Sequence, residues 1–490
     1  MSYRYNLAFQ RETFEVNEDA APSPGRADLT KGRIPWRTFR FGSPLFLGMI
    51  LHSLFNFVDI IIIGNIPDNG IVDHGEKGIV ALTLASYWNM LFLVIVNGIS
   101  VSSVAVISRY WGEGRHEEGR GVAYQSMYLM IAVSLLSAAL GLFSDPLIRV
   151  LGGEGDILWL GKRYLVIQMV GAFTMYFLLQ ITAVLRAAGD SVWPMVLLVA
   201  ANLLNVVADV VLVYGWGPFP RLGVVGAAWG TVFSRGVFMI LGFVVLVVGI
   251  KRMHIALLKP LKPAWREFWR LLKIGLPQSA QITVRLLAYM VIMRLVMEEG
   301  AMAATAFSIT AGRLDMTALF GAVGWGAAAS AMVGQNLGAG KLRRASASGW
   351  VATVYGAAIA GLMGLLFFLF AEPVMEFFFL FKKSVEPDVL RYGGTYLGIV
   401  CPAYPFIAVG IVLAQALNGA GSTKTPLCFD AFAFLLIQIP LALIMRDFAW
   451  GGSVWGLRGV YVSMLVTNVL LAGIYVVWFR LGTWKKKRIA

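Results

Sequence analysis

The sequence predicts an all-α polytopic membrane protein, with twelve transmembrane helices in two six-helix lobes related by internal duplication. Three observations support this fold class. Hydrophobic residues make up 58% of the 490 residues and charged residues only 14%, whereas a soluble domain is about 45–50% apolar and about 25% charged. Twelve apolar runs are long enough to cross a bilayer, and motifs of the first half recur in the second. The composition therefore excludes a soluble multidomain enzyme.

The elements follow in order along the chain. Residues 1–38 form a tail of mixed charge that lacks the apolar core of a signal peptide. The predicted N-lobe, 39–249, holds six runs of about 20 apolar residues or more, near 41–63, 79–107, 121–143, 159–185, 194–213 and 223–249. A basic, proline-containing linker at 250–274 comes next. The predicted C-lobe, 275–480, holds runs near 275–297, 302–333, 347–370, 389–417, 426–445 and 454–479, and a basic tail, 481–490, follows.

The distribution of charge predicts the orientation. Most of the 41 Lys and Arg residues lie in the tails, the linker and the loops on the same side of the membrane as the N-terminus. The positive-inside rule therefore places both termini and the linker in the cytoplasm, in a multi-pass protein of the plasma (inner) membrane. The net charge of +14 then predicts a basic rim facing anionic headgroups. Because this charge is spread over separate loops, no nucleic-acid partner is expected.

Two pairs of motifs and one pair of prolines indicate the duplication. Residues 108–115 (SRYWGEGR) follow the second run and 334–341 (GQNLGAGK) follow the eighth. Residues 185–190 (LRAAGD) and 417–422 (LNGAGS) each precede a proline by a few residues, and Pro44 corresponds to Pro277. Six spans in each half give the halves parallel topology. Transporters built this way bind substrate near the membrane midplane between two lobes.

Carboxylates inside the predicted spans need an explanation, since a charge at the bilayer centre costs about 2.5–3.5 kcal/mol on insertion scales. Asp59 and Asp209 each lie fifteen residues after a proline, so they reach similar depths in the first and fifth helices. Asn202, Asn205 and Asp209 share one helical face. One interpretation is a common pocket in which a desolvated carboxylate exchanges a proton. The other is that each Asp bonds to a neighbouring helix and only stabilises the lobe.

Several of these segments resemble the multidrug and toxic compound extrusion (MATE) family. The resemblance covers about residues 40–480, and the segments that carry it are 185–194, 202–209, 217–228 and 333–340. It implies secondary active efflux of organic, often cationic compounds, driven by inward H⁺ or Na⁺. Asp59, Asn205 and Asp209 fall where the proton-coupled branch carries its N-lobe ion site. Arg285 stands where the sodium-coupled NorM branch has an acidic residue, so the chain resembles the DinF-like branch more closely.

The oxygen atoms of that N-lobe trio could also hold Na⁺. For substrate contacts the candidates are Phe55, Tyr176, Gln180, Asn202, Thr231 and Arg285. Aromatic rings beside an anionic group suit planar cations, although plain helix packing explains each of these residues equally well. Arg285 could neutralise a carboxylate across the cleft, contact an anionic substrate or only pack. Pro44 is the predicted bend in the first helix.

Other chemistries find little support. Residues 334–341 depart from phosphate-loop spacing, and Leu342 replaces the required Ser or Thr. Hydrolase and metal motifs are absent from the sequence, so we expect neither an enzyme nor a cofactor beyond the coupling ion. The alternative function is a lipid-linked oligosaccharide flippase of the same superfamily, with membrane arginines contacting pyrophosphate. The expected partners are small organic substrates and the lipid bilayer, and we expect a monomer.

Overall fold

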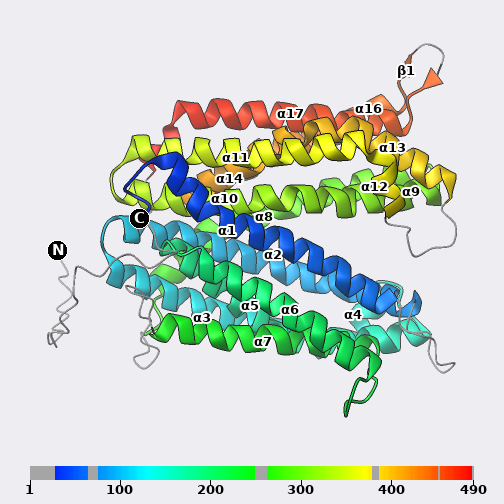
Figure 1. Cartoon of the computed structure of the whole chain (residues 1–490), viewed down its shortest axis with the longest axis horizontal. Coiled ribbons are helices and arrows are strands. Elements are labelled where there is room, and N and C mark those ends of the chain that lie inside the picture. The colour runs from blue at the N-terminus through cyan, green and yellow to red at the C-terminus, as the bar shows by residue number, and fades with distance from the viewer. Residues whose placement is uncertain (1–27, 65–75, 249–261, 378–385, 451–452, 488–490) are drawn as a thin grey trace.

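The structure is a computed structural model that describes residues 28–64, 76–248, 262–377, 386–450 and 453–487. Within these ranges a few side chains, that of Asp59 among them, lie outside the described residues. Long helices run side by side between two ends of a bundle (Figure 1). The end where the first helix begins and the last one finishes is called the terminal end below, and the other is called the opposite end.

The described part of the first lobe contains seven helices. They are α1 (Ile34–Gly64), α2 (Glu76–Gly112), α3 (His116–Gly141), α4 (Ser144–Val150), α5 (Gly155–Ala187), α6 (Val192–Tyr214) and α7 (Val224–Val248). Six of them are long and apolar. The seventh, α4, has seven residues, which is too short to cross a bilayer.

In the second lobe, three of the long helices change their winding part-way along. The elements are α8 (Trp265–Met297), α9 (Ala301–Ile309), the π-helix η1 (Thr310–Leu314), α10 (Asp315–Gly338), α11 (Leu342–Leu369), α12 (Ala371–Phe377), α13 (Pro387–Val400), the 3₁₀-helix η2 (Cys401–Ala403), α14 (Tyr404–Gly419), α15 (Lys424–Ala431), the π-helix η3 (Phe432–Gln438), α16 (Ile439–Arg446), the strands β1 (Ala449–Trp450) and β2 (Ser453–Val454), α17 (Leu457–Leu481) and the 3₁₀-helix η4 (Thr483–Lys486). The pieces α9–η1–α10, α13–η2–α14 and α15–η3–α16 each form one continuous span.

The twelve predicted spans all coincide with helices, and the fold class is confirmed. Among the described residues, eleven helices are long and apolar enough to cross a membrane. With its 31 residues, α1 supplies the twelfth span. One boundary differs, because α8 begins at Trp265 and residues 265–274 of the predicted linker are helical. Ala264, the residue before this helix, has an extended backbone. The carboxylate of Glu267 in the first turn interacts favourably with the helix dipole. Residues 249–261 lie outside the described residues.

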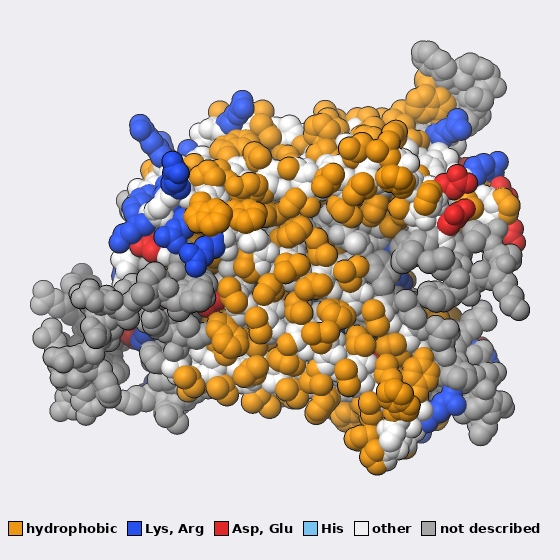
Figure 2. Space-filling view, viewed as in Figure 1, with side chains coloured by type: hydrophobic (Ala, Val, Ile, Leu, Met, Phe, Trp, Pro, Cys, Tyr) orange, Lys and Arg blue, Asp and Glu red, His pale blue; other side chains and the backbone are white. Residues whose placement is uncertain are grey.

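Two lobes and a shared region hold the core. One cluster of buried apolar side chains fills the second lobe. Another fills the half of the first lobe that lies towards the opposite end of the bundle. A third joins the lobes, since it includes Leu45 of α1, Leu271 of α8 and Met332 of α10. Hydrophobic side chains cover the middle of the visible surface, and Lys and Arg gather at the terminal end (Figure 2). This distribution fits a membrane-embedded bundle with a basic rim.

The duplicated motifs pack against each other where the lobes meet. A Cβ on Gly112 of α2 would overlap the carbonyl oxygen of Gln335 in α10, and one on Gly338 of α10 would overlap that of Arg109 in α2. These four residues are equivalent in the two repeats, because 335 and 338 follow 109 and 112 by the same 226 residues. Glycine therefore allows two helix ends to touch through their backbones at the terminal end.

The segment before α1 crosses onto the second lobe. The Leu29 side chain is fully buried, and its carbonyl oxygen accepts a hydrogen bond from Asn336 Nδ2 at 3.2 Å. Arg344 of α11 donates to the carbonyl oxygens of Lys31 and Gly32, both at 2.7 Å. We call residues 28–33 the N-terminal strap. It fixes the start of α1 to the second lobe, while α1 itself packs on α6 of the first lobe and on α10 of the second.

Candidate functional site in the first lobe

A buried carboxylate on α6 is the centre of the candidate site. Asn205 Nδ2 donates to Asp209 Oδ1 at 3.0 Å, one helical turn away. Asp209 is 1% exposed, and a Cβ on Gly230 of α7 would overlap its Oδ1 atom. The same Asn205 amide lies 3.5 Å from Thr231 Oγ1 of α7. The i, i+4 spacing on α6 and the glycine on α7 thus hold the carboxylate between two helices.

A cavity of about 460 Å³ opens beside this carboxylate, between α2, α5, α6 and α7. Its size matches small-molecule sites, which measure about 300–1,000 Å³. Three of the predicted residues, Tyr176, Asp209 and Thr231, line it together. The other polar lining residues are Ser86, Asn89, Tyr164, Gln168, Thr174 and Arg235, and the apolar ones are Leu82, Met90, Leu93, Gly171, Ala172, Met175, Ala227 and Val232.

The charge of this cavity is balanced among its described residues. Asp209 supplies one carboxylate and Arg235 of α7 one guanidinium. The side chain of Asp59, the other predicted carboxylate, lies outside the described residues. Carboxylate, amide and hydroxyl oxygens suit a proton or a small hard cation. Among the described residues, no group of three or more His, Cys, Asp or Glu side chains could hold a metal ion.

The two predicted substrate residues with amide side chains, Asn202 and Gln180, are among those that lie outside the lining of this cavity. Asn202 Nδ2 lies 3.0 Å from His52 Nδ1, so it links α6 to α1. Gln180 is fully buried, where its amide donates to Ser126 Oγ at 2.7 Å and accepts from Ser100 Oγ at 3.0 Å. Both amides therefore serve helix packing in this conformation.

Phe55 and Pro44 are on α1. Phe55 is half-buried there and does not line the cavity. The helix continues through Pro44 from Ile34 to Gly64, so the bend at this proline stays a prediction.

Arg285 pairs with a carboxylate that sequence reasoning missed. Its Nε donates to Asp430 Oδ2 of α15 at 2.6 Å. Asp430 also accepts from Gln281 Nε2 at 2.8 Å and from the Tyr475 hydroxyl at 2.7 Å. Its side chain is 0% exposed, against 32% for Arg285. Of the three interpretations, neutralisation of a carboxylate therefore describes this conformation. The expected position of that carboxylate across the cleft is wrong, because α8 and α15 belong to the same lobe.

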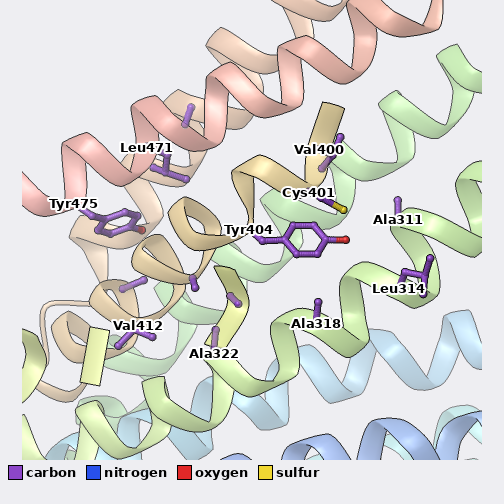
Figure 3. Close-up of a cluster of buried hydrophobic side chains, with 14 of the residues drawn as sticks. Ala311, Leu314, Ala318, Ala322, Val400, Cys401, Tyr404, Val412, Leu471 and Tyr475 are labelled. Carbon is purple, nitrogen blue, oxygen red and sulfur yellow. The ribbon is translucent and has the colours of Figure 1, made fainter. Parts of the chain in front are cut away.

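A second carboxylate of this lobe is held by hydroxyl groups. Asp315, the first residue of α10, accepts from Tyr396 at 2.5 Å and from Tyr404 at 2.6 Å. Tyr404 projects from α14 towards the turn that carries Ala311, Leu314 and Ala318 (Figure 3). The signal that finds Asp209, a lone acid in an apolar run, is also present for Asp430.

Two repeated six-span lobes with a polar cavity inside the bundle define a class, the multi-pass membrane transporters. Comparison with known proteins gives the family. The MatE family model matches residues 44–211 and 278–444, once in each lobe and more than half of the chain. The chain therefore belongs to the MatE family of transporters. Recognition as a MATE-type transporter is confirmed, and so is the two-lobe repeat.

Relatives of similar length support this assignment. The chain is 26% identical to the probable multidrug resistance protein YpnP of Bacillus subtilis, over 94% of this chain and 98% of the relative. It is 25% identical to a FAD transporter of Shewanella oneidensis, over 87% and 91%. An outward-facing multidrug resistance MATE family transporter has a TM-score of 0.84 at 22% identity, covering 94% of this chain and 98% of that one. This last likeness shows the fold alone.

Proposed function

We propose that this chain is a secondary active antiporter that exports organic cations across the plasma membrane in exchange for inward protons. The observation that carries the proposal is Asp209, which is 1% exposed and held by Asn205 beside a cavity with an aromatic and hydroxyl lining. A carboxylate in such a site can alternate between neutral and charged forms. Na⁺ is the other ion that these oxygen atoms could bind. Relatives named as multidrug resistance proteins support an organic substrate.

The exchange follows from charge balance. Ionised Asp209 attracts a cationic substrate whose flat ring stacks on Tyr176. Protonation removes that attraction and releases the substrate, and loss of the proton on the other side restores it. One charge crossing 100 mV is worth about 2.3 kcal/mol, or roughly 40-fold in concentration. A single proton exchanged for a monovalent cation is electrically neutral, so a second carboxylate, Asp59, would add the voltage-driven step.

The conformation fits one half of this cycle. Backbone contacts between Gly112 and Gln335 hold the lobes together at the terminal end. We place that end in the cytoplasm, because Lys and Arg gather there. The lobes are then closed towards the cytoplasm, as they are in the outward-facing and occluded states of an alternating-access transporter.

The flippase alternative requires arginines that converge on a pyrophosphate. Arg235 lines the N-lobe cavity, whereas Arg285 is engaged by Asp430 in the other lobe. These contacts favour drug export over the flippase.

Ethidium efflux from cells tests the proposal. Wild type should extrude the dye, a protonophore should stop it, and replacing Na⁺ with K⁺ should change it little. Asp209→Asn should lower the rate at least tenfold at equal expression. The control is Asp388→Asn, which removes an exposed carboxylate 61% accessible to solvent and should match wild type. Normal efflux by Asp209→Asn would refute the role of this carboxylate, and loss of efflux on Na⁺ removal would replace H⁺ with Na⁺.

A further inference from the structure

A second hollow lies at the terminal end, between α2 and the first turns of α8. Its volume is about 630 Å³. Tyr110 of α2 forms one wall, and Arg266, Glu267, Trp269, Arg270, Lys273 and Leu276 of α8 form the rest. Three cations thus face one carboxylate. None of these residues lines the N-lobe cavity, and we call this second hollow the α8 groove.

The helix that forms the groove carries two adjacent stripes. Arg266, Arg270 and Lys273 follow at i, i+4 and i+7, which puts their charges on one face. Beside them Trp265 and Trp269 are 77% and 67% exposed. Exposed Trp beside Lys and Arg is typical of the headgroup level, where the ring meets the edge of the hydrocarbon and the cations meet phosphate.

The groove is partly organised without a ligand. Arg270 Nη1 donates to the Tyr110 hydroxyl at 3.0 Å and to Glu267 Oε2 at 3.2 Å. The negative charge of Glu267 therefore offsets the positive charge of Arg270. Arg266 and Lys273 are exposed, and among the described residues neither has a carboxylate within ion-pair distance.

Further cations crowd the same end of the bundle. Burial, together with repulsion from Lys424 and Lys273, lowers the pKa of Lys487. The carbonyl oxygen of Lys487 accepts from Arg109 Nη1 of α2 at 2.8 Å. A negative group placed among these side chains would relieve their mutual repulsion.

We propose that the α8 groove binds the headgroup of an anionic phospholipid, with Arg266 and Lys273 on the phosphate and Trp269 beside the glycerol backbone. Lys and Arg bind phosphate through charge-assisted hydrogen bonds. The exposed Trp pair and Leu276, which is 53% exposed, provide the apolar surface for the start of the acyl chains. A soluble phosphate ester shares the headgroup chemistry but has no acyl chain to contact that apolar surface.

The groove has one wall from each lobe, because Tyr110 belongs to α2 and the cations belong to α8. It is complete only while the lobes are closed at the terminal end. Bound lipid should therefore favour that state, an effect that rests on the proposed alternating-access function. Lipid binding itself requires no substrate and no ion gradient, so its failure is distinguishable from a failure of the transport proposal.

The test measures the dissociation constant of short-chain phosphatidylglycerol for the full-length protein in detergent, by native mass spectrometry. Wild type should bind it at least tenfold more tightly than short-chain phosphatidylcholine. Arg266→Gln/Lys273→Gln should weaken binding about 25-fold, at about fivefold for each cation. The matched control, Arg33→Gln/Arg343→Gln, removes two exposed cations of the terminal end outside the groove and should change the constant less than twofold.

Three results would overturn the proposal. Equal weakening by the control pair would indicate general surface charge. Equal affinity for both phospholipids would remove the anionic specificity. Glycerol 3-phosphate that binds as tightly as the lipid would assign the groove to a soluble phosphate ester. As a control for folding, the midpoint temperature of thermal unfolding should be the same for the variants as for the wild type.

A separate measurement tests the coupling to conformation. Spin labels at Glu117→Cys in α3 and Arg343→Cys in α11, in a Cys428→Ser background, report the separation of the lobes at the terminal end. Phosphatidylglycerol should increase the short-distance population in the otherwise wild-type protein. It should leave Arg266→Gln/Lys273→Gln unchanged. An equal response of both proteins would contradict the coupling.

Discussion

At the scale of single residues, the second lobe holds two carboxylates in different ways. Asp430 accepts from a guanidinium, an amide and a hydroxyl group, whereas Asp315 accepts from two tyrosine hydroxyls. Removing one member of a buried ion pair leaves the other charge uncompensated, which costs more than the pair contributes. The contacts of Asp430 therefore predict a measurable loss of stability.

Asp430→Asn should lower the free energy of unfolding by about 2–3 kcal/mol, less than for a fully buried pair because Arg285 is 32% exposed. Chemical denaturation of the purified protein in detergent measures this loss. Arg285→Met/Asp430→Leu should recover much of it, since both charges are removed. The exposed pair Asp388 and Arg391 serves as control, and Asp388→Asn should cost no more than about 0.5 kcal/mol. Equal losses for the two Asn variants would contradict the prediction.

Sequence reasoning found the N-lobe carboxylate from two signals, and Asp430 shares only one of them, its position as an acid in an apolar run. Asp209 stood out because Asn202 and Asn205 mark the same face of its helix. Asp430 has no polar residue three or four positions away along its own span. Its partners Gln281, Arg285 and Tyr475 come from α8 and α17. Contacts between distant helices leave no local pattern. Gln180 shows the converse, because a polar residue in a span can be satisfied entirely by its neighbours.

At the scale of elements, π-helical turns adjoin both C-lobe carboxylates. The π-helix η1 ends at Leu314, directly before Asp315, and η3 begins at Phe432, two residues after Asp430. A π-helical turn accommodates an inserted residue within an α-helix. The guanidinium of Arg285 lies 5.7 Å from the ring centroid of Phe434 in η3, so this turn places an aromatic face beside the ion pair.

Deleting Leu436, which is 68% exposed in η3, should convert the π-helical segment towards regular α-helix and leave the flanking helices in register. The variant should be produced as a monodisperse protein. Deleting Leu362, which is 57% exposed in the α-helix α11, should rotate everything after it by about 100° and prevent folding. Size-exclusion chromatography compares the two. Equal loss of folded protein would show that η3 holds no removable residue.

Hydropathy predicted the twelve spans because a bilayer sets a minimum length of apolar sequence. It could not predict the π and 3₁₀ segments within the spans, because a change of helical winding does not alter the mean hydropathy of a span. Nor could it place the start of α8, since residues 265–274 alternate cations with Trp and Phe and read as a linker. That alternation is typical of a helix at the membrane surface.

At the scale of the whole molecule, the repeat has a direct structural role. The motifs recognised as duplicated, 108–115 and 334–341, contact each other where the lobes meet at the terminal end. Both end in a tight turn at a glycine with positive φ, 77° at Gly114 and 71° at Gly340. One local conformation used twice therefore builds a nearly symmetric closure at the terminal end.

Gly112→Ala should hold the lobes apart at that end, because the added Cβ would overlap a backbone oxygen of α10. The same spin-label pair, at 117 and 343, should report a longer mean distance, and ethidium efflux should fall at least fivefold. Gly398→Ala is the matched control, since an added Cβ there meets no atom within 4 Å. An unchanged distance in Gly112→Ala would mean that this contact does not limit closure.

The N-terminal strap ties α1 to both halves of the transporter. Its carbonyl oxygens are held by Arg344 and Asn336 of the second lobe, while the middle of α1 packs on α6 of the first. When the lobes rock, the two anchors of this one helix must travel with different bodies. We therefore expect α1 to bend at Pro44 when the lobes move, because the helix lacks one backbone hydrogen bond there. Arg344→Ala would remove the contact of the strap with α11, and the packing of α1 on α10 would then be its main attachment to the second lobe.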